Sequence, residues 1–264
     1  LEKYQFIDGH YLLLADGTGF FSSKSVHCEN CCVKNHRNGT QTYYHQMLGA
    51  VIAHPDHKEV FPLCPELISN TDGQTKNDCE RNASKRLLED VRREHPHLPL
   101  IVVEDALASN APHIMELEKH NMKYILGAKP GDHAYLFEQL ETSRSAAYHE
   151  IKDEDGTLHQ FNFLNNVSIN KSNLDLKGNI FEYRQTTNDG KEINFSWITN
   201  IEITKNNVYQ LMRGGRTRWK VENETFNTLK NQGYNFEHNY GHGKQYLCTI
   251  FGMLILTLLF RNHF

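Results

Sequence analysis

Apolar residues divide the first 70 positions into extended segments. β-branched and aromatic residues dominate the stretches 11–21, 42–53 and 60–68, and the turn-forming pairs Asn38-Gly39 and Pro55-Asp56 lie between them. Each stretch is short and mostly apolar, as expected for a strand with at least one buried face. The pattern predicts a meander of antiparallel strands.

The next stretch changes to helical spacing. Ala83, Leu87, Leu88 and Val91 recur at helical intervals within 77–94, and a His-Pro pair follows. A nearly continuous apolar run at 98–106 predicts a strand buried on both faces, followed by a helix from the Ser-Asn-Ala-Pro sequence to position 120 and a strand at 124–128. This order predicts an α/β fold: a mixed sheet flanked by helices.

Between positions 148 and 197 polar and apolar residues alternate, with turn signals at Asp155-Gly156, Lys177-Gly178 and Asp189-Gly190. This pattern predicts an all-β insertion. Helical spacing returns after position 204 and continues to about 230, with Gly214-Gly215 as a candidate break. We therefore expect three parts: residues 1–140 as the first part of a core, 141–203 as the β-rich insertion, and 204–264 as its helical completion.

Composition narrows the class of protein. The chain has 264 residues, enough for one large or two modest domains, and a formal charge of −4, so a nucleic-acid partner would have to meet a local basic patch. The apolar run 246–260 is shorter than the roughly 20 residues of a membrane-spanning helix and predicts a buried core helix. Six cysteines without a secretory signal indicate a reducing, cytoplasmic location. The first residue is Leu1 and the chain ends shortly after the apolar run, so we expect both ends to be incomplete.

Two aspartates interrupt apolar segments. Asp16 follows the run 11–15, where Asp16-Gly17 is also a common turn dipeptide, and Asp105 ends the run that begins at position 98. An ionised carboxylate beside a buried strand is costly unless it is paired, hydrogen-bonded or bound to a metal. Ligands bind at the carboxyl ends of strands in open α/β sheets, so the two aspartates would lie close if their strands are neighbours. Such oxygen ligands favour Mg²⁺ or Mn²⁺.

A glutamate supplies the third candidate ligand. At 3.6 residues per turn, Glu222 shares a face with Trp219, Phe226 and Leu229, whereas Glu224 falls on the opposite side. A metal would account for a carboxylate on an apolar face. Two aspartates and one glutamate are able to hold two divalent ions about 3.5–4 Å apart, a pair that activates water or a 3′-hydroxyl for attack on a phosphodiester.

Several motifs carry a family resemblance. They are DGTG from Asp16, EDAL from Glu104, the spacing Arg218-x3-Glu222, and the stretches YYHQMLGAVIAHP, WIT and RWKVENETFNTLKNQGYNFEHNYGHG. In this order they resemble DDE transposases of bacterial insertion sequences, and more narrowly the insertion-sequence family numbered four. The resemblance covers about residues 5–260. It implies a ribonuclease H-like core that is interrupted by a β-rich insertion between the second aspartate and the glutamate.

The resemblance also implies roles for individual residues. Asp16, Asp105 and Glu222 would be the metal-binding catalytic triad, with two Mg²⁺ or Mn²⁺ ions, and Arg218 would contact a DNA phosphate. The family signature has a tyrosine three residues before this arginine and a lysine seven residues after the glutamate. This chain has Gly215 and Leu229 there, and Lys230 follows one place later on nearly the same face. The family's N-terminal DNA-binding region has no counterpart before the first residue.

A basic cluster precedes the glutamate. Arg213, Arg216, Arg218 and Lys220 could track a DNA backbone, and a solvated helix face is the alternative. We favour DNA contacts for Arg216, Arg218, Lys220 and Lys230. Trp219 fits a core position better than a base-stacking one, because it recurs at helical spacing with apolar residues. Glu104 should point to the face of its strand opposite Asp105, which leaves it out of the triad.

Cysteines and histidines near position 30 raise a separate metal hypothesis. Cys28, Cys31 and Cys32 lie between His27 and His36, with His45 further on. A Cys-x2-Cys pair supplies two of the four ligands in many zinc sites, but the spacing of the other candidate ligands is irregular here. Free thiols in a loop are the favoured interpretation, and zinc stays open.

The sequence as a whole favours a DDE transposase catalytic domain acting on transposon ends and target DNA, without a membrane partner. Synapsis of two ends suggests a dimer by family analogy. The alternatives are an inactive or truncated remnant that only binds DNA and a ribonuclease H-like nuclease without strand transfer.

Overall fold

The computed structural model describes residues 1–28, 30–68, 70 and 79–239, and residues 250, 254, 255, 257 and 258 near the C-terminus. The chain divides into two compact units. The first contains residues 1–4, 13–98 and 219–264, and the second contains 5–12 and 99–218. Eleven strands occur among the described residues, five numbered before α1 and six after it.

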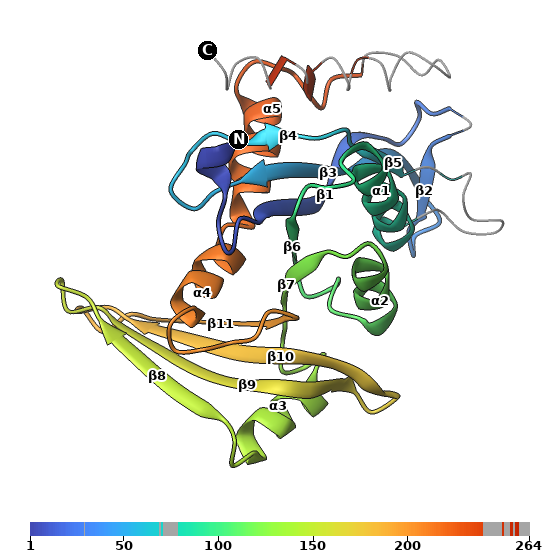
Figure 1. The fold of residues 1–264 in the computed structure, drawn as a ribbon. Coiled ribbons are helices and arrows are strands. Elements are labelled where there is room, and N and C mark those ends of the chain that lie inside the picture. The colour runs from blue at the N-terminus through green and yellow to red at the C-terminus, as the bar shows by residue number, and fades with distance from the viewer. Residues whose placement is uncertain are drawn as a thin grey trace. The chain divides into compact units, whose positions relative to one another are not determined.

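The strands of the first unit follow the predicted meander in part. A short helix η1 (Glu2–Tyr4) begins the chain. Hydrogen-bonded neighbours run in the order β2-β3-β1, and β4 and β5 both pair antiparallel with β3, as Figure 1 shows for β3, β4 and β5. The bounds are β1 (Tyr11–Ser23), β2 (Cys32–Asn35), β3 (Gln41–Ala53), β4 (Phe61–Pro62) and β5 (Glu66–Ile68). The segment predicted as one strand at 60–68 is thus two short strands separated by Leu63, Cys64 and Pro65, since Pro65 has no N–H to donate to a ladder. Strand β2 was not predicted.

Helix α1 (Glu80–Glu94) covers β3 and β5 of the first unit (Figure 1). It buries the four apolar residues that the spacing identified, Ala83, Leu87, Leu88 and Val91. Arg86 extends from the same helix and donates from Nε to Glu66 Oε1 over 2.5 Å, which ties α1 to β5. The predicted amphipathic helix is therefore confirmed over its described part.

The second unit begins with a strand–helix–strand segment. Strand β6 (Leu100–Glu104) is fully buried and pairs in parallel with β7 (Lys123–Gly127). Helix α2 (Ala111–Lys119) connects them, and Asn110 caps it by accepting a hydrogen bond from the His113 N–H over 3.2 Å. A buried parallel strand pair joined by a helix is the βαβ unit that the continuous apolar run predicts.

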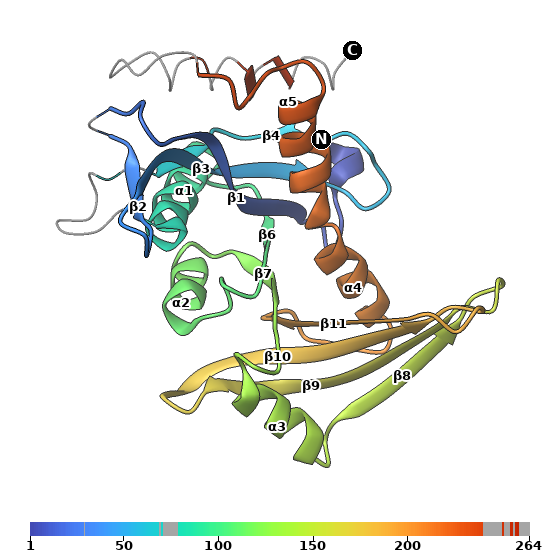
Figure 2. The same cartoon turned by 180° about the vertical axis from the view of Figure 1, so that it is seen from behind.

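The all-β insertion is a set of long antiparallel strands, visible side by side in Figure 2. Their order from β7 is β7-β11-β10-β9-β8. The bounds are β8 (Ala147–Lys152), β9 (Leu158–Asn170), β10 (Asn173–Thr186) and β11 (Glu192–Thr199). Helix α3 (Ala134–Thr142) was not predicted. It packs on β9, where the Gln139 side chain donates to the Ser168 carbonyl over 2.9 Å and accepts from its N–H over 3.2 Å.

The helical segment after position 204 has three parts. Helix α4 (Val208–Arg216) belongs to the second unit, whereas η2 (Val221–Phe226) and α5 (Asn227–Asn231) belong to the first. The predicted break near Gly214-Gly215 lies slightly later, at Thr217, because both glycines are buried within α4. A Cβ at position 215 would lie 2.5 Å from the Trp197 indole, so this position in α4 requires glycine.

These elements confirm the predicted fold class. The second unit alone contains parallel and antiparallel strand pairs together with helices, so the sheet is mixed, and the arrangement is consistent with a ribonuclease H-like α/β fold. Most of the predicted core helix at 246–260 lies outside the described residues. Within the described part of the chain, no helix is long and apolar enough to cross a membrane.

Candidate functional site

Asp16 lies within a strand and not in a turn. Strand β1 continues through Asp16-Gly17 to Ser23, so the turn interpretation is wrong. The strand is buried from Tyr11 to Ala15, and Asp16 is the first half-exposed residue after that run. Its Oδ1 accepts a hydrogen bond from the Gly17 N–H over 2.9 Å. The Asp16 carboxylate therefore lies at the position where the buried part of β1 ends.

A second carboxylate lies beside this part of β1. The Glu80 side chain, in the first turn of α1, fills the space next to Gly17, where a Cβ would overlap its carboxylate. A side chain at position 17 would therefore displace the Glu80 carboxylate from this place beside β1. Sequence reasoning did not single out Glu80, since nothing in its helical spacing distinguishes it from a solvated residue at a helix start.

The segment that carries Glu222 packs beside Asp16 within the first unit. Phe226, four residues after Glu222, lies over Gly49 of β3, where a Cβ would come within 2.7 Å of the Phe226 ring. The Asp16 carbonyl oxygen is 4.0 Å from the same point. The glycine in β3 thus allows η2 to approach the strand pair that contains Asp16.

Glu222 itself lies in a π-helical turn. The Asn227 N–H donates to the Glu222 carbonyl, a five-residue spacing, and the side chain is half-exposed. Single π-turns are rare in α-helices and occur frequently at functional sites. Glu224, which the regular spacing placed on a solvated side, is also half-exposed.

The π-turn explains one incorrect prediction. Trp219 was expected in the core with Phe226 and Leu229, but half of its surface is exposed (50%). Helix α4 ends at Arg216, and the π-helical turn η2 begins at Val221. A π-turn has more residues per turn than an α-helix, so the rotation of 100° per residue that placed Trp219 beside Phe226 does not apply here. Phe226 and Leu229 are buried as predicted.

Asp105 belongs to the second unit and directly follows β6, as predicted for a strand-end carboxylate. Its Oδ1 accepts from the Leu107 N–H over 2.8 Å, and the side chain is half-exposed. The preceding Glu104 is buried and forms an ion pair with the buried His113 of α2. The two neighbouring carboxylates therefore have different surroundings, which supports leaving Glu104 out of the triad.

Three of the four predicted DNA-contacting residues contact an acceptor within their own unit. Arg216 donates from Nη1 to Gln185 Oε1 over 3.2 Å and lies over the Phe195 ring in the second unit. In the first unit, Lys220 donates from Nζ to the His54 carbonyl over 2.9 Å and also to that of His57. Lys230 pairs with the exposed Glu237 over 2.9 Å, and Arg218 is half-exposed.

Both departures from the family signature have a structural counterpart. Gly215 stands where the signature has tyrosine, and the indole of Trp197 fills the space beside it. Leu229 stands where the signature has lysine, and it is completely buried. Neither position would accept the family residue without local rearrangement. Trp197 in turn stacks on Phe181, with ring centroids 5.1 Å apart.

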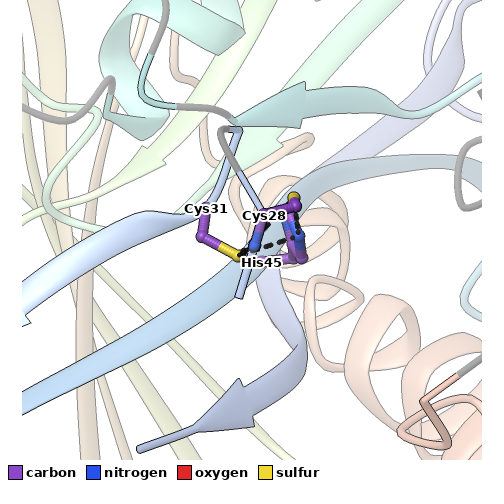
Figure 3. Close-up of side chains that lie close together, drawn as sticks. All are labelled: Cys28, Cys31 and His45. Atoms are coloured by element: carbon purple, nitrogen blue, oxygen red, sulfur yellow. Dashed lines mark hydrogen bonds between the residues drawn. The ribbon is translucent and has the colours of Figure 1, made fainter. Parts of the chain in front are cut away.

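A different set of metal-binding atoms converges in the first unit. Cys28, Cys31 and His45 place their ligand atoms within 4.8 Å of one another (Figure 3). Among the described residues, they form the one group of three or more His, Cys, Asp or Glu side chains close enough to share a metal ion. Burial raises the pKa of the Cys31 thiol to about 11, and the nearby Cys28 contributes. None of the three cysteines of this segment forms a disulfide.

Comparisons with known proteins agree with the sequence motifs. The family model described as the transposase DDE domain matches residues 33–260. No curated protein matches the chain. The chain is similar to piggyBac transposase in a cryo-EM structure of its synaptic complex with hairpin DNA, with 10% identity and a TM-score of 0.49. The match covers 95% of this chain and 47% of that one, so the chain spans about half the length of that protein.

Proposed function

Because the chain belongs to the transposase DDE domain family, we propose that it is a catalytic domain that cleaves DNA at transposon ends and transfers the strands to target DNA. More narrowly, we propose an origin in a bacterial insertion sequence of the family numbered four. The observation that carries the proposal is the packing of the Glu222-bearing π-turn, through Phe226 and Gly49, beside the Asp16 backbone.

Asp16, Asp105 and Glu222 are proposed to hold the divalent metal ions that DDE transposases generally use. The fit rests on their chemistry: all three are half-exposed carboxylates, and hard oxygen ligands suit Mg²⁺ or Mn²⁺. A bound pair of ions would activate a water or 3′-hydroxyl and stabilise the leaving oxygen. The protein's part is to orient the carboxylates, and the hydrogen bonds that Asp16 and Asp105 accept from nearby backbone N–H groups support this.

DNA is the proposed partner, bound as transposon ends and target, with a dimer as the proposed assembly. Arg216, Arg218, Lys220 and Lys230 are the proposed phosphate contacts. Lys220 and Lys230 each have an intramolecular acceptor, so binding DNA would exchange that acceptor for a phosphate oxygen. A cytoplasmic location and the three-part division at 140/141 and 203/204 also remain proposals.

A strand-transfer assay tests the proposal. The purified protein would be incubated with DNA that carries its own element ends, a target plasmid and Mg²⁺ or Mn²⁺. Cleaved ends and joined products are expected for wild type, and neither for Asp105→Asn. The Glu104→Gln variant, altered at the adjacent carboxylate, serves as the matched control and should retain activity as far as it folds.

The same assay separates the two alternatives. A nuclease without strand transfer would cut the DNA but give no joined product. An inactive remnant would shift the DNA in a gel without cutting it. Equal activity of wild type and Asp105→Asn would show that the catalytic assignment is wrong.

A further inference from the structure

We propose that Cys28, Cys31 and His45 bind a zinc ion that has a structural role in the first unit. The three side chains come from the segment before β2 and from β3, and their ligand atoms face one another in Figure 3. This site uses sulfur and nitrogen ligands, so it differs in chemistry from the carboxylates proposed for catalysis. The inference does not depend on the proposed function.

The distances among the ligand atoms match a tetrahedral zinc site. Cys28 Sγ and Cys31 Sγ are 3.7 Å apart, and His45 Nε2 lies 3.5 Å from Cys28 Sγ and 3.3 Å from Cys31 Sγ. With Zn–S bonds of about 2.3 Å and Zn–N bonds of about 2.0 Å, tetrahedral angles place two sulfurs about 3.8 Å apart and sulfur and nitrogen about 3.5 Å apart. One ion therefore reaches all three atoms with little movement of the side chains.

Strand pairing brings these residues together. β2 and β3 are antiparallel with Cys32 opposite Tyr44, so the same register continued by one residue places Cys31 opposite His45. A turn then returns the chain to Cys28, with the Cys31 N–H donating to the Cys28 carbonyl over 3.2 Å. The Cys28 N–H donates to Cys31 Sγ over 3.3 Å. A backbone donor to sulfur stabilises a metal-bound thiolate from outside the ligand set.

The histidine ring is fixed in a ligating orientation. His45 is buried and stacks on Phe20 of β1, with the centroids 5.6 Å apart and the planes 6° from parallel. Phe20 in turn contacts Phe236 edge to face. Because Phe20 lies four residues after Asp16 on the same strand, an ion at His45 would stabilise the strand pair that also presents Asp16.

The other cysteine and histidines near this point have different contacts. Cys32 Sγ donates to the Ile68 carbonyl over 3.7 Å, and His36 bonds Thr42 Oγ1 through Nε2 over 2.8 Å. The His27 ring stacks on Tyr43, with centroids 4.2 Å apart. The described residues therefore supply three ligands, and solvent takes the fourth position beside the half-exposed Cys28.

Sulfur ligands decide the class of metal. Thiolate and imidazole select Zn²⁺ over Mg²⁺ and Mn²⁺, which prefer oxygen. The alternative for two close cysteines is a disulfide, but 3.7 Å is far beyond the bond length of about 2.05 Å.

Cobalt substitution tests the ligand set directly. The purified protein, stripped of metal by a chelator under reducing conditions, would be titrated with Co²⁺. We expect the first equivalent to produce the intense visible bands of a tetrahedral ion and a thiolate-to-cobalt charge-transfer band, and one equivalent of Zn²⁺ to remove both. Absence of the charge-transfer band in wild type would overturn the proposal. The proposal would also be wrong if these cysteines formed a disulfide and bound no metal.

Variants assign the ligands and the structural role. Cys28→Ser, at a half-exposed position, should lose the charge-transfer intensity of one thiolate, whereas Cys64→Ser, at an exposed cysteine outside the cluster, should leave the spectrum unchanged. Zinc at a hundredfold excess over its dissociation constant should raise the melting temperature of wild type by about 5–10 °C. The same zinc should give a much smaller shift in Cys28→Ser. Equal spectra or equal shifts in the two variants would contradict the assignment.

Discussion

The polar groups of the two units differ in what surrounds them. In the first unit, Asp16 and Glu222 are half-exposed carboxylates at the points where apolar segments are interrupted. The second unit has one carboxylate of this kind, Asp105, but its buried polar groups satisfy one another: Glu104 pairs with His113, and His159 bonds the Tyr183 hydroxyl over 2.7 Å. A buried polar group that is paired within the protein stabilises the fold, whereas an accessible ligand atom is available to an ion or substrate.

Histidines and carboxylates therefore have two roles in this protein, as metal ligands by our proposal and as internal partners of other buried groups. Histidine is a member of a zinc site in the first unit at His45, by our proposal, and an internal partner in the second unit at His113 and His159. Carboxylates divide in the same way between Asp16 and Glu104. We therefore expect a change at Asp16 to affect metal-dependent activity with the fold retained, and changes at the proposed zinc site or at the internal pairs of the second unit to affect stability.

The largest expected effect is on activity at Asp16. Asp16→Asn keeps the size and the hydrogen-bond acceptor of the side chain but removes its charge, so strand cleavage should fall more than about 100-fold, beyond the loss typical of residues that only support a ligand. Rates would be measured on element-end DNA with Mn²⁺, and circular dichroism should show an unchanged fold. Asp8→Asn, at an exposed position, is the control and should cleave like wild type. Cleavage by Asp16→Asn at the control rate would remove Asp16 from the site.

A large stability effect is expected at His113. His113→Ala removes the buried hydrogen-bonding partner of the buried Glu104 carboxylate, which should cost about 3 kcal/mol of unfolding free energy. Urea unfolding would measure it. Lys119→Ala, which removes an exposed pair with Glu116 from the same helix, should change stability by less than about 0.5 kcal/mol. Similar losses of unfolding free energy in the two variants would mean that a buried pair stabilises the protein no more than an exposed pair.

A smaller stability effect is expected at Gly215. In Gly215→Ala the new methyl group would meet the Trp197 indole, and overpacking of this kind costs about 1–3 kcal/mol. Gly131→Ala, with no atom within 4 Å of the added carbon, should be neutral. Thermal unfolding of both variants checks the prediction, which fails if Gly215→Ala is as stable as wild type.

The smallest effect concerns alkaline pH. Burial raises the pKa of Tyr183 to about 12, above the usual value near 10. Between these values the unfolded chain loses the proton while the folded chain keeps it, so this residue lowers stability as pH rises from about 10 to about 12. Tyrosinate absorbance should show a late-titrating group in wild type that is missing in Tyr183→Phe. An unchanged titration in the variant would assign the late group elsewhere.

Much of the fold was predictable because burial leaves a direct periodic signal. The continuous apolar run predicted β6, and helical spacing predicted the four buried apolar residues of α1. Helix α3 was missed because it starts at His133 without a side-chain cap and its apolar residues are partly aromatic. The sequence also failed at Trp219, since periodicity assumes a regular helix and a π-turn changes the angle per residue.

The candidate site was predictable residue by residue but not as a geometry. The carboxylates Asp16 and Asp105 were identifiable because each follows an apolar strand. The partnership of His45 with Cys28 and Cys31 depends on the register of β2 and β3, and β2 was not predicted. The sequence named His45 among several candidate ligands, and a separation of 14 residues from Cys31 does not by itself select it over His27 or His36.

The central claim is that Glu222 is a ligand for the catalytic metal, and two glutamates of one π-turn test it most directly. Glu222 and Glu224 are both half-exposed and two residues apart, so Glu222→Gln and Glu224→Gln make the same chemical change in the same segment. We predict that Mn²⁺-dependent cleavage of element-end DNA is lost in Glu222→Gln and retained in Glu224→Gln. Equal cleavage by the two variants, with the fold intact in both, would contradict the account.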